Sequence, residues 1–304
     1  WKVRELALDA LETLLADLQA EGPHDSQVWL VDNDSGDGTV EAVSRRFPQV
    51  HMLASDENLG FAAGNNLALR SMGFGSLKGD ALPRAVYLLN PDTQTQAGAT
   101  SKLYQALFAN KGVGLVGAQL SYEDGSFQHS AFKFPGLRQL WAEFFPLPGR
   151  LIEGTFNGRY PRKRYAAGKP FRIDFPLGAT MMLRREVIET TGMFDENFAL
   201  YCEEIDWAWR IRKAGWQAFC VPAARVTHLD GRSSAQARPE SVLKLWRSRA
   251  GLFRKHYPQW REHVARRLII KGLRRRLQNH ERNPELREVY RTLISELRSG
   301  GGPG

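Results

Sequence analysis

The spacing of apolar residues alternates between a helical and a strand period along the first ~120 residues. In the opening helix, apolar side chains recur every three or four positions from Leu6 to Leu18 and so share one face. Short apolar runs between the helices, such as residues 28–31, indicate buried strands. Helices are predicted at residues 3–18, 40–47, 64–72 and 100–109, and strands at 28–31, 51–53, 85–89 and 113–118. This alternation predicts an α/β fold with a mostly parallel sheet and helices covering both faces.

The pattern breaks at residues 127–175, which hold several Pro and Gly residues, many aromatics and a basic cluster at residues 162–164. We expect a long, irregular and partly mobile loop here, and long loops are often functional. Regular spacing then returns. Strands are predicted at residues 178–183 and 217–221, and helices from 185 and at 205–214, 242–257, 260–278 and 284–297. Residues 300–304 have the composition of a flexible tail.

The composition is that of a globular protein. Of the 304 residues, 42% are hydrophobic and 25% charged, which excludes disorder over most of the chain. The only two cysteines, Cys202 and Cys220, exclude a disulfide scaffold and lack zinc-site spacing, so we expect buried thiols in a reducing compartment. No run of about 18 apolar residues occurs, so no membrane-spanning helix is expected.

The net charge of +9 is distributed unevenly. Residues 232–304 hold 18 Lys and Arg against 6 Asp and Glu, a net of +12, while residues 1–231 have a net charge of −3. A basic C-terminal quarter suits a nucleic acid or an anionic membrane surface. The sequence starts at Trp1, without Met or a signal peptide.

Three predicted strands end in polar clusters, and an open parallel sheet binds its ligands at the carboxyl ends of its strands. In the first cluster, Asp32 stands directly at the strand end, followed by Asn33 and Asp34, and we expect Asp32 to contact a ligand. Asp37 and Thr39 follow in a turn, where we expect them to cap the next helix.

The second cluster, residues 58–66, combines Gly with Asn. It either places backbone N–H groups and a helix N-terminus beside a phosphate or sugar, or forms a tight loop.

The third cluster is Asn90-Pro91-Asp92. Asp92 can hold a divalent ion whose shell is completed by phosphate oxygens of a substrate, although this tripeptide is also common in turns.

Two later parts of the chain carry candidate chemistry, residues 203–207 and His228. One carboxylate among Glu203, Glu204 and Asp206 can act as a general base, or all three simply stabilise the first turn of a helix. Trp207 is either a core residue or stacks on a sugar. A lone His is most often structural, whereas one that closes a strand and faces an acidic site can be a nitrogen ligand of a metal, and both alternatives are open for His228.

Taken in order, these motifs resemble the family 2 inverting glycosyltransferases with the GT-A fold, and within them the bacterial rhamnosyltransferase-like enzymes of cell-surface polysaccharide assembly. The resemblance rests on seven segments that follow one another in the family's order over about 200 residues. These segments are residues 32–35 with 37–39, 58–66, 90–92, 178–179 with 184–186, 192–196, 201–206 and 228–231.

The resemblance implies a Rossmann-like, mostly parallel sheet with flanking helices, followed by a C-terminal helical extension. It divides the chain into a nucleotide-sugar-binding catalytic domain at 1–231, a basic helical extension at 232–298 and a flexible tail at 299–304.

The resemblance also implies roles for single residues. Asp92 matches the last Asp of the family's metal motif and His228 a His near the metal and diphosphate, so Mg²⁺ or Mn²⁺ is the implied cofactor. Glu204 aligns with the catalytic base, with Glu203 and Asp206 as alternatives. The implied substrate-binding residues are Asp32, Asn33, Asp34, Asn58, Gly60, Gly64, Asn65 and Asn90 around the nucleotide, Gly178 and Ala179 beneath the acceptor, and Trp207.

The chain departs from the family pattern in two places. The family more often has Asp where this chain has Glu204, which is one methylene longer but keeps the carboxylate. The family also begins with an apolar strand immediately before the helix that opens here. We therefore expect the sequence as given to lack that first strand, with Trp1 directly after it.

The implied activity is inverting transfer of a sugar, with rhamnose the candidate, from a nucleoside-diphosphate sugar to a hydroxyl of a saccharide or lipid-linked acceptor. The implied location is the cytoplasm, at the inner face of the cell membrane. Basic residues interleave with apolar ones between 266 and 277, which suits either contact with anionic lipid headgroups or a helix packed on the body with a solvated arginine face.

Three other classes remain as alternatives. A sugar-nucleotide nucleotidyltransferase also uses a metal and a diphosphate, but Glu204 and His228 fit a glycosyltransferase better. A nucleic-acid partner is not expected, because no recognised binding motif appears. The last alternative is a non-catalytic scaffold with a degenerate transferase fold, bound to nucleic acid or a membrane.

Overall fold

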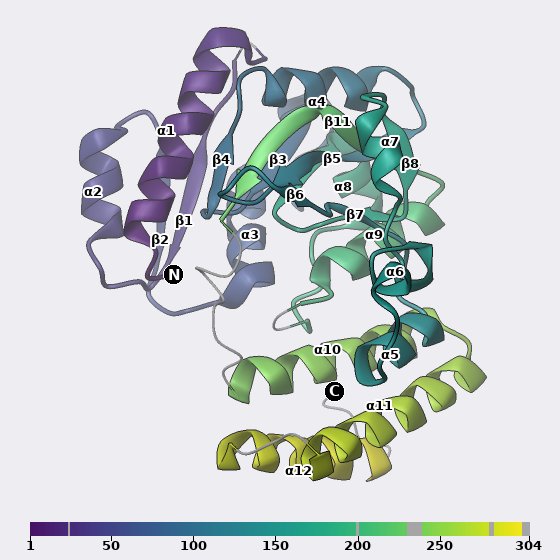
Figure 1. The fold of residues 1–304 in the computed structure, drawn as a ribbon. Coiled ribbons are helices and arrows are strands. Elements are labelled where there is room, and N and C mark those ends of the chain that lie inside the picture. The colour runs from purple at the N-terminus through teal and green to yellow at the C-terminus, as the bar shows by residue number, and fades with distance from the viewer. Residues whose placement is uncertain (24, 199–200, 230–238, 280–282, 300–304) are drawn as a thin grey trace.

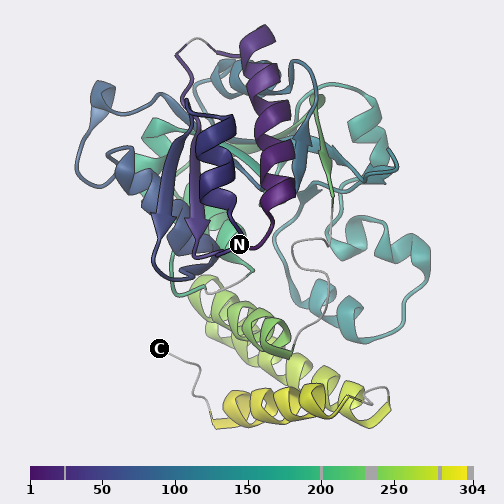
Figure 2. The ribbon, with the colours of Figure 1, turned by 90° about the vertical axis from the view of Figure 1, so that its left-hand side faces the viewer.

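The computed structural model describes residues 1–304 apart from 24, 199–200, 230–238, 280–282 and 300–304. The predicted tail at 300–304 and the predicted domain boundary at 231 lie outside the described residues. Figure 1 shows a body in which helices cover a central sheet, with a layer of C-terminal helices below it. The same separation between body and helical layer is visible from the side (Figure 2).

The N-terminal part of the body is a parallel strand pair flanked by helices. It consists of α1 (Arg4–Glu21), β1 (Trp29–Asn33), α2 (Thr39–Arg46), β2 (His51–Ser55) and α3 (Gly60–Ser71). β1 and β2 pair in parallel, and buried Leu11 of α1 packs with Val43 of α2 in an apolar cluster. The predicted elements are confirmed here, except that α3 starts four residues earlier than expected, at Gly60.

The central sheet is built from strands far apart in the sequence. Its strands are β3 (Ala85–Leu89), β4 (Thr93–Thr95), β5 (Val113–Ser121), β6 (Phe127–Gln128), β8 (Phe171–Ile173), β10 (Thr180–Arg184) and β11 (Gln217–His228). The order is β3, β10, β5, β11, β4, with β6 beside β5 and β8 beside β11. Within the described residues, the β1–β2 pair forms a separate sheet. The expectation that a family strand is missing before α1 stays a prediction.

The predicted α/β fold is confirmed, but the strand pairing is mixed rather than mostly parallel. β5 and β11 pair in parallel, and β3 runs in the same direction, because β10 lies antiparallel between β3 and β5. β4, β6 and β8 are antiparallel to their neighbours as well. Parallel neighbours require a crossover connection, usually a helix. β10 is antiparallel to both of its neighbours, so the long segment at 127–179 that leads into it need not form such a crossover.

Alternating side chains of the central strands bury both faces of the sheet. On one face, Met182 packs with Leu103 and Leu107 of α4 (Ala99–Phe108). On the other face, Met181 and Leu183 pack against α8 (Arg185–Thr191) and α9 (Glu203–Lys213). Successive residues of a strand point to opposite faces, so a strand covered on both sides must be apolar throughout. This explains the continuous apolar run in β10.

The segment at 127–175 is not the irregular loop that was predicted. Besides β6 and β8 it contains β7 (Ala131–Phe132), α5 (Leu137–Phe144), α6 (Gly149–Ile152), α7 (Arg162–Ala166) and β9 (Phe175–Pro176), with short 3-10 turns at Gly79–Ala81 before it and Thr155–Asn157 within it. Its aromatic residues form a core: Phe134, Tyr165 and Phe175 are each at most 9% exposed. Burial of these large rings stabilises a segment that has little regular hydrogen bonding.

The three predicted C-terminal helices are present as α10 (Pro239–His256), α11 (Gln259–Asn279) and α12 (Pro284–Ser299). Together with α5 they form the layer in Figures 1 and 2, around buried Trp246, Ile269 and Leu293. No described helix is long and apolar enough to cross a bilayer. The layer thus includes α5, which lies within the predicted catalytic domain. The division of the chain into domains stays a prediction.

Candidate functional site

One group of candidate residues lies where β1 ends and α3 begins. Asp32 is buried and accepts a hydrogen bond from the Ser35 N–H at 3.0 Å, which shapes the turn after the strand. Asn33 donates from Nδ2 to the Gly60 carbonyl at 3.0 Å. A Cβ on Gly64 would lie only 3.0 Å from the same Asn33 Nδ2, so glycine allows α3 to approach the strand end closely. The structure therefore brings residues 32–33 together with residues 60–64.

The turn after β1 holds two further aspartates in different surroundings. Asp34 is exposed and adopts the left-handed backbone conformation, with φ 55°. Asp37 accepts a hydrogen bond from the N–H of Thr39 at 3.1 Å. The N-cap residue is Gly38, however, and Thr39 is the first residue of α2, so neither predicted residue occupies the capping position. Burial alone would raise the pKa of Asp37, but hydrogen bonds from Thr39 and Arg4 lower it.

The asparagines around α3 mainly satisfy backbone groups. Asn58 accepts from the Gly60 N–H at 3.0 Å, and Asn65 donates to the carbonyl four residues before it at 2.8 Å. Asn66, which was not predicted to be a site residue, is buried and exchanges two 3.0 Å hydrogen bonds with the backbone of Phe194. The cluster at 58–66 therefore builds the start of α3 and connects it to the segment at 192–196.

A second group lies where β11 ends and meets the turn after β3. Asp92 and His228 are 2% and 6% exposed, and Asp92 Oδ1 lies 3.4 Å from His228 Nε2. The Leu229 N–H donates to the Asp92 carbonyl at 2.8 Å and fixes the two segments side by side. The other ring nitrogen of His228, Nδ1, lies 3.2 Å from Gln128 Oε1. The structure thus pairs the two predicted metal ligands, which are more than 130 residues apart in the sequence.

The distance between these two side chains fits a shared divalent ion. Mg²⁺ binds its ligands at about 2.0–2.1 Å in an octahedron, so adjacent ligand atoms lie roughly 3 Å apart. The 3.4 Å between Asp92 Oδ1 and His228 Nε2 is close to that spacing. Among the described residues, no third His, Cys, Asp or Glu joins them. Two protein ligands suit an ion that takes its remaining oxygens from a phosphate and water.

Backbone and side-chain contacts connect this pair to the predicted base. The Asn90 N–H donates to the Ala179 carbonyl at 3.1 Å, which joins the Asp92 turn to the turn before β10. A Cβ on the neighbouring Gly178 would lie 3.6 Å from Glu204. Gly178 and Ala179 were predicted to lie in the strand. They lie in the turn before it instead, because β10 starts at Thr180. Asp92, His228 and Glu204 are therefore linked through one small-residue turn.

Glu203 and Glu204 open α9 in surroundings that favour the uncharged carboxyl. Burial raises the pKa of Glu204 to about 7, opposed by backbone hydrogen bonds and by the charge of Arg249. Burial and the neighbouring Glu204 raise the pKa of Glu203 to about 8. A carboxylate whose pKa lies near neutral pH can both accept a proton and be regenerated. Glu204 is half-buried and Glu203 fully buried, so Glu204 is the more accessible of the two.

Asp206, the third carboxylate of the predicted set, is already engaged in a network of charges. It is fully buried and receives hydrogen bonds from His256 Nε2 at 2.6 Å and Arg210 Nε at 2.9 Å, and Lys255 Nζ lies 2.7 Å away. Although burial opposes ionisation, these partners lower the pKa of Asp206 to about 2. Such a weak base is suited to holding α9 against α10 rather than to accepting a proton.

The expectation that Trp207 stacks on a sugar is wrong. Its side chain is completely buried, packs edge-on against Phe194, and donates from Nε1 to Thr191 Oγ1 at 2.9 Å. The alternative reading as a core residue holds, because Trp207 lies on the face of α9 that packs on the sheet. No surface of the indole is left to contact a ligand.

Several residues that complete the site were not found from the sequence. Gln128 lies in the segment interpreted as a loop, and Lys255 and His256 lie in a predicted helix of the extension to which no site residue was assigned. Each contacts a predicted site residue about 50 to 100 positions away, a separation at which local sequence patterns carry no information.

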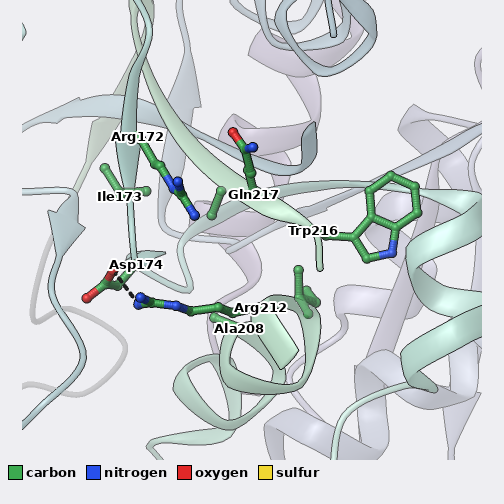
Figure 3. Close-up of a pocket in the computed structure, with 9 residues that line it drawn as sticks. Arg172, Ile173, Asp174, Ala208, Arg212, Trp216 and Gln217 are labelled. Atoms are coloured by element: carbon green, nitrogen blue, oxygen red, sulfur yellow. Dashed lines mark hydrogen bonds and ion pairs between the residues drawn. The ribbon is translucent and has the colours of Figure 1, made fainter. Parts of the chain in front are cut away.

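A small hollow elsewhere on the sheet is not a candidate site (Figure 3). It is lined by residues including Arg172, Asp174, Arg212 and Gln217, and it has room for about one water molecule. Its one carboxylate, Asp174, already pairs with Arg212 at 2.9 Å. The hollow lies at the start of β11, whereas His228 ends that strand.

The model of the family Glycosyl transferase family 2 matches residues 4–192. Among curated proteins, an N-acetylglucosaminyl-diphospho-decaprenol L-rhamnosyltransferase of Mycobacterium tuberculosis is 29% identical over 235 residues, which cover 74% of each chain. The O-antigen biosynthesis protein RfbC of Myxococcus xanthus is 26% identical over 282 residues, 90% of this chain and 20% of that protein. The low-salt glycan biosynthesis hexosyltransferase Agl10 of Haloferax volcanii is 25% identical over 70% of this chain and 64% of its own length.

Among solved structures, the chain is similar to GalNAc-T7 crystallised with UDP, GalNAc and Mn²⁺. The TM-score is 0.58 at 12% sequence identity, and the match covers 96% of this chain but only 53% of the other. At this level of identity the likeness shows a common fold.

Proposed function

Because the chain belongs to glycosyl transferase family 2 and is a glycosyltransferase of the GT-A fold, we propose that it transfers a sugar from a nucleoside-diphosphate sugar to an acceptor hydroxyl, with inversion. One observation carries this proposal. The buried Asp92–His228 pair is connected through the turn at 178–179 to Glu204, a carboxyl whose pKa lies near neutrality. This arrangement supports the proposal, because such a transfer requires a group that holds a divalent ion together with an accessible base.

In the proposed reaction, different residues of this chain act on the two sides of the sugar, some on the departing diphosphate and one on the acceptor hydroxyl. Asp92 and His228 would hold Mg²⁺ or Mn²⁺, which when bound neutralises charge on the departing diphosphate. Glu204 takes the proton of the acceptor hydroxyl while that oxygen bonds to the anomeric carbon. The bond between the anomeric carbon and the diphosphate oxygen breaks, and its electron pair leaves with the nucleoside diphosphate. Attack from the side opposite the leaving group inverts the configuration.

The residues at the end of β1 supply the proposed nucleotide contacts. Asp32 and Asn33 lie at a strand terminus beside the start of α3, where an α/β sheet binds its ligands. The exposed Asp34 extends this surface. We assign the base and ribose to this group and the diphosphate to the Asp92–His228 group, because only the latter pairs a carboxylate with an imidazole.

The donor and acceptor are proposed from the relatives. The Mycobacterium tuberculosis relative is named for transfer of L-rhamnose to a diphospho-decaprenol-linked N-acetylglucosamine, and the Myxococcus xanthus relative for O-antigen biosynthesis. We therefore propose rhamnose as the transferred sugar and a lipid-linked or cell-surface saccharide as the acceptor.

A donor screen tests the activity. Purified protein with Mn²⁺ is incubated with nucleoside-diphosphate sugars, a rhamnose donor among them, and a lipid-linked saccharide, and release of nucleoside diphosphate is measured. Asp92→Ala is expected to abolish metal-dependent donor binding, whereas Asp9→Ala, an exposed aspartate on α1, leaves it unchanged. Equal donor affinity of the Asp92 variant with and without Mn²⁺ would remove Asp92 from the metal site.

We also propose that the molecule works beside an anionic membrane on its cytoplasmic side, through the outer face of α11. The apolar face of α11 is not available for insertion, because Ile269 and Leu273 are completely buried against the other helices of the layer. Its opposite face exposes Arg267, Lys271 and Arg274, which recur every three or four residues. Cations at a bilayer surface are attracted to anionic headgroups.

Exposed aromatic side chains adjoin this cationic face. Trp260 at the start of α11 is 59% exposed, and Trp141 of α5 is 39% exposed and stacks on Phe145 at 5.3 Å. Lys271 Nζ lies 5.8 Å from the centre of the Phe145 ring. Tryptophan beside cations is typical of surfaces that rest in the headgroup region of a membrane.

A further inference from the structure

Gln128 is a buried polar side chain that no step of the proposed reaction uses. It belongs to the two-residue strand β6, is 5% exposed, and is held by pairing with Leu120 of β5. Its Oε1 lies 3.2 Å from Nδ1 of His228, which is itself 6% exposed. A buried amide requires hydrogen-bond partners, so this contact is part of how the strand is held.

The contact favours one tautomer of His228. The structure turns the amide oxygen of Gln128 towards Nδ1, and because an amide oxygen accepts hydrogen bonds, this arrangement matches the tautomer in which Nδ1 carries the proton. In the neutral imidazole the other nitrogen, Nε2, then has a lone pair. That lone pair faces the Asp92 carboxylate oxygen at 3.4 Å. Two electron-rich atoms at this distance repel one another unless a cation lies between them.

We propose that Gln128 is a positioning residue, which holds His228 in the Nδ1–H tautomer so that Nε2 and Asp92 together present a cation site. The inference rests on the metal role proposed above, and it adds a residue that acts on the metal through the imidazole. Partners of this kind fix the ring orientation of ligating histidines, and their loss typically weakens metal binding about 10- to 100-fold.

The tautomer is measured directly in the metal-free protein. In protein labelled with ¹⁵N-histidine, long-range ¹H–¹⁵N correlations distinguish Nδ1–H from Nε2–H, and His228→Asn assigns the His228 signals among the seven histidines. The wild type is expected to show Nδ1–H at His228. Gln128→Leu removes the acceptor, and its His228 is expected to shift towards Nε2–H, pointing at Asp92.

Metal affinity is the second readout. Free Mn²⁺ is titrated by electron paramagnetic resonance without any donor. Gln128→Leu is expected to bind Mn²⁺ about 10- to 100-fold more weakly than wild type. Gln128→Glu keeps an acceptor oxygen of the same reach and is expected to retain both the tautomer and the affinity, which also keeps the test valid if the leucine variant fails to fold. Gln217→Leu makes the same change at the other end of β11 and is expected to alter neither quantity.

The outcomes separate this inference from the proposed function. If wild-type His228 carries its proton on Nε2, the amide is donating and the inference is overturned, whatever the enzyme's activity. Unchanged Mn²⁺ affinity and tautomer in a folded Gln128→Leu variant overturn it as well. A protein that transfers no sugar but shows the expected tautomer and affinity changes refutes the proposed reaction and retains Gln128 as the positioning residue.

Discussion

At the scale of single residues, Glu203 and Glu204 differ in what their ionisation can do. Burial raises the pKa of both carboxyls, and the charge of Glu204 raises the pKa of Glu203 further, so Glu203 is the more readily protonated of the two. Glu204→Gln removes the base and is expected to lower kcat by about 10²- to 10⁴-fold. Glu203→Gln replaces one uncharged group by another and serves as the control, with kcat close to wild type. Steady-state transfer assays decide the assignment, and a Glu204→Gln variant within a few fold of wild type would exclude Glu204.

The raised pKa of Glu204 also sets the pH dependence of transfer. The base must be ionised to accept a proton, so kcat is expected to rise as pH increases through about 7 and to be low near pH 5. A carboxyl with its ordinary pKa would already be fully active at pH 6. The profile is measured with saturating donor and Mn²⁺, while donor binding is followed separately over the same range. An activity that stays constant from pH 5 to pH 8 contradicts a base of this kind.

The sequence made the residue types of the site predictable, but not all of their roles. Asp92, His228 and Glu204 could be selected because each stands at the end of a strand or the start of a helix, where side chains reach a ligand. Trp207 could be either a core residue or a sugar contact, because local spacing does not tell which side of α9 faces the sheet, and its burial decides for the core. Gln128 was missed, because its importance comes from a contact 100 residues away.

At the scale of elements, α9 and α10 are joined through one buried carboxylate. Asp206 contacts Lys255 and His256 of α10 and Arg210 of its own helix. Asp206→Ala removes the buried carboxylate that these three groups share, although Lys255 keeps Asp195 as a partner at 2.6 Å. The variant is expected to lower the free energy of unfolding by about 3–5 kcal/mol. Glu12→Ala, which breaks an exposed pair with Arg46, is the control and is expected to cost at most about 1 kcal/mol. Urea unfolding measures both, and equal losses would refute the network's role.

The same carboxylate gives stability a dependence on acid. The pKa of Asp206 is lowered from 3.8 to about 2 in the folded chain, so its contribution is complete above about pH 4 and disappears as pH falls through 2. The wild type and Asp206→Ala are therefore expected to converge in unfolding free energy as the pH is lowered through this range. Urea titrations at several pH values test this, and a constant difference between the two proteins down to pH 2 is the contrary result.

Two helix glycines test how closely the C-terminal helices pack. A Cβ on Gly272 of α11 would overlap the Phe144 ring of α5, whereas a Cβ on Gly251 of α10 would lie 3.8 Å from Phe198, an ordinary contact. Alanine favours a helix over glycine by about 1 kcal/mol. Gly251→Ala is therefore expected to be neutral or stabilising, and Gly272→Ala to destabilise by about 1–3 kcal/mol. Thermal unfolding compares the two variants, and a stabilised Gly272→Ala would show that α5 does not pack there.

The elements themselves were largely predictable, whereas their arrangement was not. The pattern of apolar residues located α1, α10 and the central strands, because each helix buries one face and a central strand buries both. The direction of β10 and the folded segment at 127–175 depend on contacts between distant residues, such as the stacking of Phe134 on Trp209 at 4.1 Å. The many aromatic residues of that segment could not be recognised as a core from the sequence, because the distant residues on which they pack are known only from the structure.

At the scale of the whole molecule, charge is divided between a body of net −3 and a C-terminal quarter of net +12. Much of the basic charge in α11 faces outward, away from the helices that cover its apolar side. The proposed site for a divalent cation and the proposed surface for anionic lipid are therefore separated within one chain. This separation allows membrane contact to be altered without changing the residues of the proposed reaction.

The surface of α11 is tested by reversing its exposed charges. The variant carries Arg267→Glu, Lys271→Glu and Arg274→Glu together. If each basic residue near a bilayer contributes about 1 kcal/mol, this variant is expected to bind vesicles of anionic phospholipid at least about 100-fold more weakly than wild type in sedimentation assays at low salt. A control with the same change in net charge reverses exposed Arg45, Lys111 and Lys169 on the body, and it is expected to bind as wild type does.

Salt and competing ligands separate the possible causes of such binding. Electrostatic attraction to headgroups weakens at high ionic strength, since charges are screened beyond about 8 Å at physiological salt, and it is absent from vesicles of neutral lipid. Trp141→Ala is expected to reduce binding further at a given salt concentration, because its indole is exposed beside Lys271 and Phe145. If both triple variants lose binding equally, net charge rather than the α11 face is responsible. Salt-sensitive binding to RNA without binding to anionic vesicles would assign the same cations to a nucleic acid and refute the membrane proposal.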